Sequence, residues 1–220
     1  MKKAFIFGTT DFAQVALPYL RDDSDYDVKA FVVNEDYIAE PELLGLPVVP
    51  LEKILTTHPP KEYVAFVGVG YSKVNAVRRK LYDSLKELGY TLPTYVHSSV
   101  HRWPETTYGE ASFIFENNVI QPFVSIGNNC VLWSGNHIGH HSKIGNNVFI
   151  ASHAVISGRC TIGDNCFVGV NATFRDNISV AEDCVIGAGA LLLKDAGPAG
   201  VYKAAATDPA ERRSSELRNF

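Results

Sequence analysis

Residues 126–150 read IGNNCVLWSGNHIGHHSKIGNNVFI, and an aliphatic side chain occupies every sixth position of this stretch. The same six-residue apolar phase continues without interruption from Ile114 to Leu192. This period fits neither an α-helix nor a half-buried strand of an ordinary sheet. It is typical of a β-helix, in which each six-residue unit supplies one short strand and one corner. The side chains expected to point inward are Ile114, Ile120, Ile126, Leu132, Ile138, Ile144, Ile150, Ile156, Ile162, Val168, Phe174, Val180, Ile186 and Leu192.

Three such units would complete one coil, so residues 18 positions apart should lie above one another. The pairs Tyr108-Gly109, Ile126-Gly127, Ile144-Gly145 and Ile162-Gly163 follow this spacing. We therefore predict a left-handed parallel β-helix domain at residues 99–196, with coils from about residue 106 to 194. The remaining residues, 197–220, are expected to form a tail that ends in a short charged helix at Glu211–Arg218.

The composition narrows the class of protein. A chain of 220 residues with 46% hydrophobic residues can form one large or two modest domains. The net charge of −4 argues against nucleic-acid binding, which normally accompanies a basic surplus. No apolar stretch is long enough to span a membrane, and Met1–Phe7 resembles a first strand more than a signal peptide. We expect a cytoplasmic protein that binds neither nucleic acid nor membranes.

The four cysteines occupy one slot of the repeat, two residues before an inward-pointing side chain. Ser142, Ala154, Ala172 and Ala190 fill the same slot elsewhere. A free cysteine packs as a small hydrophobic residue. We therefore interpret the cysteines as packing residues rather than a disulfide or metal set. They are Cys130, Cys160, Cys166 and Cys184.

Residues 1–98 carry a different pattern, in which short apolar runs alternate with segments of helical spacing. Such alternation predicts a small parallel α/β domain of Rossmann type. The expected strands are Lys3–Phe7, Asp27–Asn34, Leu46–Val49, Tyr63–Val69 and Thr94–His97, and the expected helices are Asp11–Arg21 and Ser72–Leu88. The junction with the second domain falls within Ser98–Thr107.

A glycine-containing turn follows the first expected strand, at Gly8–Ala13. Such strand-turn-helix segments can present helix-start amides to a phosphate, although a simple tight turn is the alternative. A pair of glycines, Gly68 and Gly70, ends a later strand at the same sheet edge, and open α/β sheets bind ligands there. The expected nucleotide-binding residues are Gly8, Thr9, Thr10, Asn34, Gly68, Gly70 and Lys73.

Four histidines cluster in the sequence of the predicted β-helix: His137, His140, His141 and His153. Because Ile138 and Ile144 hold core positions, His140 and His141 should lie near a corner. A neutral imidazole there can accept a proton from an amine or a hydroxyl group. A histidine on the surface or at a subunit interface is the alternative interpretation.

Polar residues 18 positions apart predict ladders along the corners. Asn118 and Asn136 are expected to stack as an amide pair. Asn and Asp suit tight corners, so we interpret both ladders as structural. The second ladder comprises Asn128, Asn146, Asp164 and Glu182.

The whole chain resembles the sugar O- and N-acyltransferases of the sialic-acid O-acetyltransferase type. The resemblance rests on the run Ala4–Gly8, the segment Tyr71–Lys80, the six-residue repeats and the ending Ile186–Asp195. It implies a Rossmann-like domain joined to a left-handed β-helix, a homotrimer, and transfer of an acyl group from coenzyme A to a nucleotide-linked sugar. The acceptor implied is an amino group, with a hydroxyl group as the alternative.

The resemblance also implies roles for particular residues. Residues 140–145, His-His-Ser-Lys-Ile-Gly, match the pattern around the family's general base, so His140 matches the base. His141 stands where the family has an acidic residue, and it either orients His140 or is itself the base. Ser157-Gly158 matches a Ser-Gly pair near the thioester. The residues expected to bind acetyl-coenzyme A are Gly158, Ala188 and Lys194.

Two other functions compete with an acetyl-CoA-dependent sugar N-acetyltransferase that needs no metal. One is a zinc enzyme of the β-helical carbonic-anhydrase type, with histidines of neighbouring subunits as ligands. A nucleotide-binding domain would have no purpose there. The other is a trimer that binds nucleotide sugars without catalysis.

Overall fold

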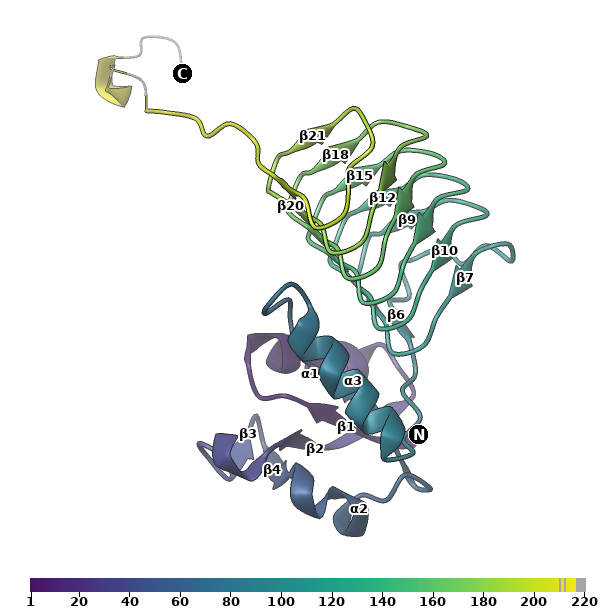
Figure 1. Ribbon diagram of the computed structural model, residues 1–220. Helices are drawn as coiled ribbons and strands as arrows, with labels where there is room; N and C mark the ends of the chain where they lie inside the picture. The colour runs from purple at the N-terminus through teal and green to yellow at the C-terminus, as the bar shows by residue number, and fades with distance from the viewer. Residues whose placement is uncertain (210, 212, 217–220) are drawn as a thin grey trace.

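The computed structural model describes residues 1–209, 211 and 213–216, which form an α/β domain and a β-helix that stands on it as a column (Figure 1). Residues 203–209 extend away from this column. Of the helix expected at Glu211–Arg218, Ser214–Glu216 forms a single 3₁₀ turn, whereas residues 212, 217 and 218 lie outside the described residues. Among the described residues, every helix is too short or too polar to span a bilayer.

The N-terminal domain is a five-stranded sheet in the order β3-β4-β2-β1-β5. All neighbouring strands are parallel except β3 and β4, which form an antiparallel pair. Strand β1, which lies between β2 and β5, is buried from Ala4 to Phe7, as its apolar run predicts. The strands are β1 Lys2–Phe7, β2 Tyr26–Val33, β3 Glu42–Leu43, β4 Leu46–Pro50 and β5 Tyr63–Val67.

Helices cover both faces of this sheet. Helix α1 packs on one face through Phe12, Ala16 and Leu20, and helix α3 packs on the other through Leu85. The helices are α1 Asp11–Asp22, α2 Ile54–Thr57 and α3 Ala76–Glu87, with 3₁₀ turns at Glu35–Tyr37 and Leu51–Lys53. The strand β3, the helix α2 and the 3₁₀ turns were not expected, because segments of two to four residues carry no measurable periodicity.

Helix α3 begins later than its apolar spacing predicts. The expected start was Ser72, but Lys73, Val74 and Asn75 have φ angles of 52°, 50° and 64°. These values lie in the left-handed region, which no right-handed helix can include. The helix therefore starts at Ala76, after a left-handed turn.

The β-helix consists of three parallel sheets whose strands are two residues long. The first sheet contains β7 Thr107–Tyr108, β10 Ser125–Ile126, β13 Lys143–Ile144, β16 Thr161–Ile162 and β19 Ser179–Val180. The second contains β6 Tyr95–Val96, β8 Phe113–Ile114, β11 Val131–Leu132, β14 Phe149–Ile150, β17 Phe167–Val168, β20 Val185–Ile186 and β22 Val201–Tyr202. The third contains β9 Val119–Ile120, β12 His137–Ile138, β15 Val155–Ile156, β18 Thr173–Phe174 and β21 Leu191–Leu192.

The 18-residue coil predicted from the sequence is confirmed. Strand pairs join Ile126 to Ile144, Leu132 to Ile150, and Ile138 to Ile156. All fourteen side chains predicted to point inward are at most 5% exposed. Stacked aliphatic side chains thus form the continuous core that removes these residues from water.

The ends of the β-helix differ from the expectation. The strand expected at Thr94–His97 exists as β6, but it pairs with β8 and therefore extends the β-helix rather than the N-terminal sheet. At the other end, β22 pairs with β20, although the six-residue apolar phase has already ended. A strand's sequence does not reveal which of two parallel sheets it joins.

The slot for small side chains is buried as expected. Each cysteine is free and fully buried, and its sulfur approaches a backbone carbonyl of the following coil. Burial raises the pKa of Cys130 to about 11 and that of Cys166 to about 12. Protonated, buried thiols are poor nucleophiles and poor metal ligands, which agrees with a packing role.

The ladder predicted from Asn128 is present as far as Asp164, whereas no hydrogen bond among the described residues extends it to Glu182. Asn128 accepts a hydrogen bond from the amide of Glu110, and its own amide donates to Asn146 Oδ1; both distances are 2.9 Å. Asn146 N donates in turn to Asp164 Oδ1 at 2.7 Å. A parallel ladder joins the side chains of Asn129, Asn147, Asn165 and Asp183.

The amide pair expected at Asn118 and Asn136 takes a different form. Both side chains are buried, but each donates to backbone carbonyls, including that of Trp133. Asn136 Oδ1 accepts from Ala154 N at 2.8 Å. Each amide therefore bonds the backbone of its corner rather than the other amide.

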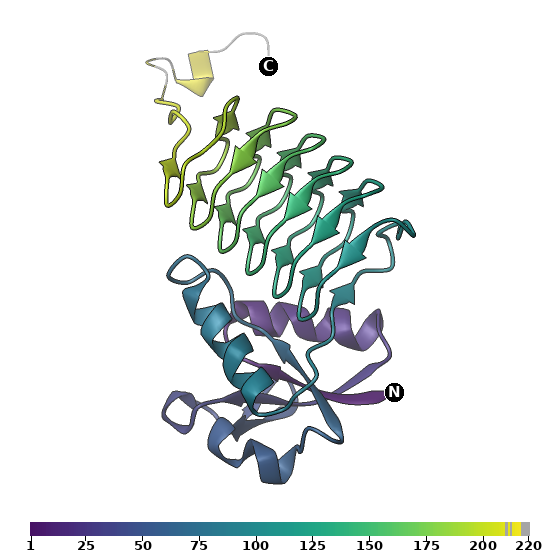
Figure 2. The ribbon, with the colours of Figure 1, turned by 45° about the vertical axis from the view of Figure 1, so that its right-hand side comes forward.

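An apolar contact joins the two domains. Outward-pointing Phe113, Val131 and Phe149 of the second sheet pack with Phe12 and Phe66 of the N-terminal domain in one buried cluster. In two views of the ribbon, α1 and α3 lie against the lower coils of the β-helix (Figures 1 and 2).

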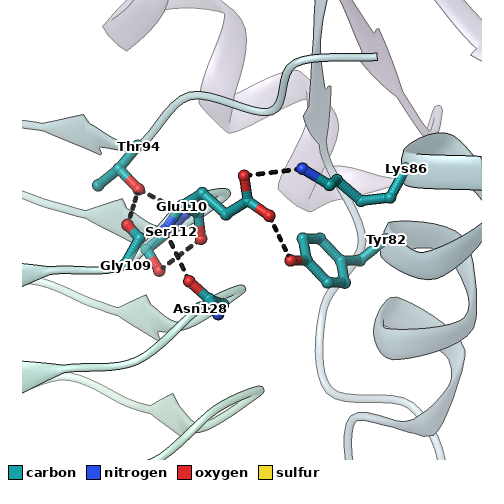
Figure 3. Close-up of polar contacts among 7 residues, drawn as sticks. All are labelled: Tyr82, Lys86, Thr94, Gly109, Glu110, Ser112 and Asn128. Atoms are coloured by element: carbon teal, nitrogen blue, oxygen red, sulfur yellow. Dashed lines mark hydrogen bonds and ion pairs between the residues drawn. The ribbon is translucent and has the colours of Figure 1, made fainter. Parts of the chain in front are cut away.

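A polar contact supports the same interface. Tyr82 and Lys86 of α3 both reach the carboxylate of Glu110, at 2.6 and 2.9 Å (Figure 3). Burial raises the pKa of Glu110, but the two hydrogen bonds and the charge of Lys86 outweigh it and hold that pKa below its usual value. Burial and the bond to Glu110 also raise the pKa of Tyr82.

We expect Ile150→Asp to prevent folding. Ile150 is fully buried between Leu132 and Val168 of the adjacent coils. An unpaired carboxylate there costs several kcal/mol, comparable with a total stability of roughly 5–15 kcal/mol. Circular dichroism should show no cooperative thermal transition, whereas Thr161→Asp, on an exposed strand position, should melt like the wild type. A normally folded Ile150→Asp protein would contradict the observed register.

We expect Glu110→Gln to flatten the acid dependence of stability. Because the folded-state pKa of Glu110 is lowered, its carboxylate stabilises the protein above the unfolded-state pKa of about 4.3. That stabilisation is lost as the pH falls through the folded-state pKa. Below about pH 4.3 the Tm of the variant should therefore fall less steeply than that of the wild type. Glu105→Gln, at an exposed position, is the control, and equal slopes for all three proteins would disprove the role of Glu110.

Candidate functional site

The N-terminal half of the candidate site lies at the carboxyl edge of the α/β sheet. Gly8, Asn34 and Gly68 directly follow the adjacent strands β1, β2 and β5. Thr9 and Thr10 continue from Gly8 into the start of α1. The structure thus brings together five of the seven expected nucleotide-binding residues, at the edge where open α/β sheets bind ligands.

The two glycines at this edge have a packing role. A Cβ atom on Gly8, whose φ is 122°, would lie 2.6 Å from Gly68 O, and a Cβ on Gly68 would lie 2.8 Å from Ala13 Cβ. Their amides donate to Val32 O and Phe7 O, at 2.8 and 2.7 Å. These two amides are therefore not available to a phosphate, although the sequence predicts that glycine amides at this edge would bind one.

The start of α1 offers better phosphate donors. The first amides of a helix have no acceptor within the helix, and the helix dipole favours an anion there. The cap residue Thr10 makes no side-chain bond to these amides. Any phosphate at this edge would therefore meet the amides that follow Thr10, rather than those of Gly8 and Gly68.

At the same edge, Asn34 Nδ2 donates to Glu52 Oε1 at 3.2 Å. The two remaining expected residues, Gly70 and Lys73, lie further out. Gly70 lies beside a cavity between the two domains, and its carbonyl accepts from Arg78 Nη1 at 3.1 Å. Lys73 is exposed in the left-handed turn before α3, so its ammonium group is free to approach an anion.

The interdomain cavity has a volume of about 490 Å³, and most of its wall is aromatic or aliphatic. The N-terminal domain contributes Asp11, Phe12 and Tyr71, and the β-helix contributes Trp133 and Phe149. The other lining residues are Val15, Gly70, Ala151, Ser152, Phe167, Gly169, Val170 and Ala188. An apolar cavity with one carboxylate and several backbone groups is typical of a small-molecule site.

Most lining residues were not predicted from the sequence, although one signal was present. Phe113, Val131, Phe149, Phe167 and Val185 recur every 18 residues at outward-pointing strand positions. Outward-pointing apolar residues on one wall indicate that another surface covers that wall. This row of outward-pointing apolar residues therefore marks both the domain interface and the side of the β-helix that borders the cavity.

The second half of the candidate site is the corner after β12. His140 Nδ1 and His141 Nδ1 lie 3.1 Å apart, and both residues are exposed. The amide of His140 donates to Gln121 Oε1 at 2.8 Å, and the ring of His141 stacks on Phe123 with centroids 4.7 Å apart. When Nδ1–H of His140 donates to His141, Nε2 of His140 is left as a proton acceptor.

The four histidines do not form one cluster. His137 points outward from β12 in the third sheet, whereas His153 lies at another corner, against Gly135. Gly135 has a φ of 76°, and a Cβ there would lie 2.5 Å from His153 Nδ1, so a larger residue would displace that ring. Only His140 and His141 are joined by a hydrogen bond between their rings. In the described part of the chain, no three His, Cys, Asp or Glu side chains are close enough to hold a metal ion.

Backbone strain is concentrated at this corner. Phe123, His141 and Arg159 have φ angles of 65°, 61° and 60°, and they stack in consecutive coils. Other corners mostly use Asn, Asp or Gly, which tolerate the left-handed region better. Each unfavourable residue costs about 1–2 kcal/mol, and such strain commonly marks functional positions.

The residues expected to bind coenzyme A fall on two different edges. Gly158 lies one coil beyond His140, and a Cβ there would lie 2.8 Å from His140 Cε1. Lys194 follows two coils later on the same edge, at the same 18-residue spacing. Ala188 instead lines the interdomain cavity on another edge.

Within one chain the two halves of the site are separate. The N-terminal domain packs on the second sheet, whereas His140 and His141 lie at the corner between the third and first sheets. A ligand in the interdomain cavity therefore faces a different edge of the β-helix from the histidine pair.

Comparisons with known proteins agree with this fold. Residues 123–158 and 159–194 each match the family described as bacterial transferase hexapeptide (six repeats), so this part of the chain is built of hexapeptide repeats. No curated protein matches the chain by sequence. Because these repeats cover only part of the chain, the solved structures provide the wider comparison.

Three solved structures share the architecture. PerB from Caulobacter crescentus, in complex with CoA and GDP-perosamine, is 24% identical; the match covers 90% of this chain and 91% of PerB, with a TM-score of 0.78. The acetyltransferase domain of PglB from Neisseria gonorrhoeae, in complex with acetyl coenzyme A, is 22% identical over 90% and 93% of the two chains, with a TM-score of 0.78. WeeI from Acinetobacter baumannii is 18% identical over 87% and 96%, with a TM-score of 0.65.

The expected fold class is therefore confirmed: an α/β domain of Rossmann type followed by a left-handed parallel β-helix. At these identities the likeness establishes the fold, and the function is argued from the site.

Proposed function

We propose that this protein transfers the acetyl group of acetyl-CoA to an amino group of a nucleotide-linked sugar, as sugar acyltransferases of the sialic-acid O-acetyltransferase type do. The observation that carries the proposal is the histidine pair, which leaves one imidazole nitrogen free at an exposed, strained corner of a hexapeptide-repeat column. Acyl transfer requires little more than a positioned thioester, a positioned acceptor and a base. The chemistry is thus within reach of the residues present.

The ligands of the structural neighbours support the same assignment. PerB was solved with CoA and GDP-perosamine, and the PglB domain with acetyl coenzyme A. In this proposal the nucleotide sugar binds at the N-terminal sheet edge and acetyl-CoA binds at the edge of the β-helix. Gly158 and Lys194 would contact the donor there, and Ala188 would do so from another copy of the chain.

The proposed reaction needs one base. The lone pair of the acceptor amine attacks the thioester carbonyl carbon, the carbon–sulfur bond breaks, and CoA leaves as a thiolate. His140 Nε2 takes the proton from the nitrogen and returns it to the sulfur, so protons and charges balance. His141 orients the His140 ring through the Nδ1–Nδ1 contact.

A complete site would require a second copy of the chain. The outward side chains of the third sheet include Val119, Val155 and Leu191, which are 56%, 39% and 63% exposed, whereas the first sheet presents Ser, Thr and Lys. Exposed apolar residues on one flat side indicate a subunit interface. Since His140 borders this side, packing three copies around an axis would carry each histidine pair toward a neighbour.

We expect a homotrimer in solution. Multi-angle light scattering should give three times the chain mass of 24.1 kDa. Val155→Asp places a charge on the exposed third sheet and should shift the protein toward monomers without unfolding it. The control Thr161→Asp, on the first sheet, should remain trimeric. A stable wild-type monomer that retains full activity would rule out a site shared between copies.

Release of the CoA thiol in the presence of amino-sugar nucleotides tests the proposed reaction. His140→Ala should lower kcat by roughly 10²–10⁴-fold, the usual contribution of a general base, without changing the oligomeric state. His153→Ala is a matched control, since that ring lies at another corner. A panel of uridine, thymidine and guanosine diphosphate sugars, with amino and hydroxyl acceptors, would identify the substrate.

The same variants decide between the two rings. If His141→Ala is inactive while His140→Ala keeps nearly normal kcat, His141 is the base. If both variants remain fully active, the proton acceptor lies elsewhere. If wild-type protein releases no thiol with any sugar yet binds nucleotide sugars, a non-catalytic binding trimer is the better description.

A further inference from the structure

The turn between β5 and α3 has an unusual backbone. Lys73, Val74 and Asn75 are consecutive, and all three have φ angles in the left-handed region. Neither lysine nor β-branched valine is favoured there, so other contacts must hold this conformation. The turn begins at Gly70 and Tyr71, which form part of the N-terminal wall of the interdomain cavity.

Asn75 fixes the end of the turn to the β-helix. Its side-chain nitrogen donates to Asn165 O and Cys166 O, each at 3.0 Å, and the side chain is fully buried. Its backbone amide donates to Tyr71 O at 3.1 Å, which closes the turn. The residue thus joins the cavity wall to a corner of the β-helix.

Arg78 fixes the beginning of the turn. It is 1% exposed, and Nη1 donates to Gly70 O at 3.1 Å and to Asn75 Oδ1 at 3.0 Å. Its other nitrogens donate to Asn129 O at 3.2 Å and to Asn147 O at 2.8 Å, in two consecutive coils. One planar guanidinium group therefore connects the cavity wall with the backbone of the β-helix.

The charge of Arg78 has no ion-pair partner among the described carboxylates. Burial lowers the pKa of Arg78 to about 10, so the side chain remains protonated at neutral pH. A buried cation that bonds only carbonyl and amide oxygens is costly. An apolar side chain in its place would leave the carbonyl oxygens of Gly70, Asn129 and Asn147 without this donor, so the guanidinium group is the link between these three backbone segments.

Tyr71 shows what the two residues hold in place. Its ring packs against Phe149 and Phe167 of the β-helix, with centroid distances of 5.0 and 4.8 Å, although the residue is 56% exposed. Because more than half of the residue is exposed, these two ring contacts and the turn behind it together hold Tyr71 in place.

We propose that Arg78 and Asn75 are positioning residues for the acceptor substrate, because they hold Gly70, Tyr71 and Lys73 in the shape that binds the nucleotide-linked sugar. This inference rests on the proposed function. The donor residues Gly158 and Lys194 lie along the His140 edge, which neither residue touches. Ala188 lies on the β-helix wall of the cavity and not on the turn that Arg78 and Asn75 hold. Loss of either contact should therefore weaken binding of the acceptor and leave binding of acetyl-CoA unchanged.

Three variants test the inference in the intact protein. Asn75→Gly keeps access to the left-handed region and removes the side-chain bonds, Arg78→Met removes the guanidinium group, and Arg78→Lys keeps only the charge. The KM for the amino-sugar nucleotide should rise about tenfold or more for Asn75→Gly and Arg78→Met, and less for Arg78→Lys. The KM for acetyl-CoA should stay within about twofold of the wild-type value.

Arg79→Met is the matched control, since Arg79 is exposed and makes one marginal bond, 3.5 Å long, to Asn165. Both kinetic constants of this variant should match the wild type. If the variants of Asn75 and Arg78 raise both KM values equally, or change neither, they do not position the acceptor. If Arg78→Met fails to fold, the two KM values of Asn75→Gly still test the inference.

Hydrogen exchange separates this inference from the proposed reaction. Amides of residues 69–76 should exchange faster in Asn75→Gly than in the wild type, with residues 126–150 unchanged. Unaltered exchange at 69–76 would overturn the inference even if the enzyme is active. If the wild type transfers no acetyl group, the proposed reaction fails. In that case the wild type and the Asn75 and Arg78 variants are compared by their affinity for a uridine diphosphate amino sugar. Binding is followed by the fluorescence of Trp133 in a Trp103→Phe background. Equal affinity of wild type and variants would overturn the positioning role.

Discussion

Every coil of the β-helix must change direction three times, and each change requires a residue with positive φ. Positive φ recurs at every sixth residue from Ala111 to Gly189, three positions after each inward-pointing side chain. The six-residue spacing of the inward-pointing side chains and the six-residue spacing of the positive φ angles together keep the strands two residues long and stack the coils in register. The three flat sides, the domain interface and the histidine corner all follow from this constraint. Because Asn, Asp and Gly satisfy it at least cost, residues of other types at these positions stand out.

The repeat could be predicted from the sequence because its physical cause is local. An inward-pointing aliphatic residue and a corner recur within six residues, so the core positions, the coil length and the cysteine slot were all correct. The histidine pair was located for the same reason, since Ile138 and Ile144 fix the register around it. Which of the two rings is the base does not follow from register, because both lie at one corner.

The parts that could not be predicted depend on contacts between distant segments. Strand β6 reads as any short apolar strand, and only its pairing with β8 assigns it to the β-helix. Helix α3 has a continuous apolar stripe, but the bonds of Asn75 to residues some ninety positions away stabilise a left-handed turn where the stripe predicts a helix. The glycines at the sheet edge were identified correctly as special, although packing rather than phosphate binding is the reason the structure supplies. The cavity between the domains was not predicted because one wall comes from the α/β domain and the other from the β-helix, and the sequence pattern of either domain does not show how the two pack.

The two domains differ in how they contribute to a site. The β-helix presents a rigid edge on which small differences of side chain change the chemistry, whereas the α/β domain presents loops whose shape depends on what they touch. Arg78 and Asn75 connect these two kinds of surface, since both bond the backbone of the β-helix rather than its side chains. Substitutions of side chains on the outer surface of the β-helix can therefore accumulate without breaking the hydrogen bonds that hold the turn between β5 and α3.

The 18-residue coil also restricts how the length of this chain can change during evolution. Insertion of a whole coil would lengthen the column and leave each later strand on its own side. Insertion of a single six-residue unit would preserve the buried core equally well, but it would move every later strand to the next side of the triangle. Phe167 would then leave the side that faces the α/β domain, and Leu191 would leave the side that carries the exposed residues Val119 and Val155. Viable length variants of this protein should therefore differ by whole coils, so that duplication of eighteen codons, not six, is the unit of change within the column.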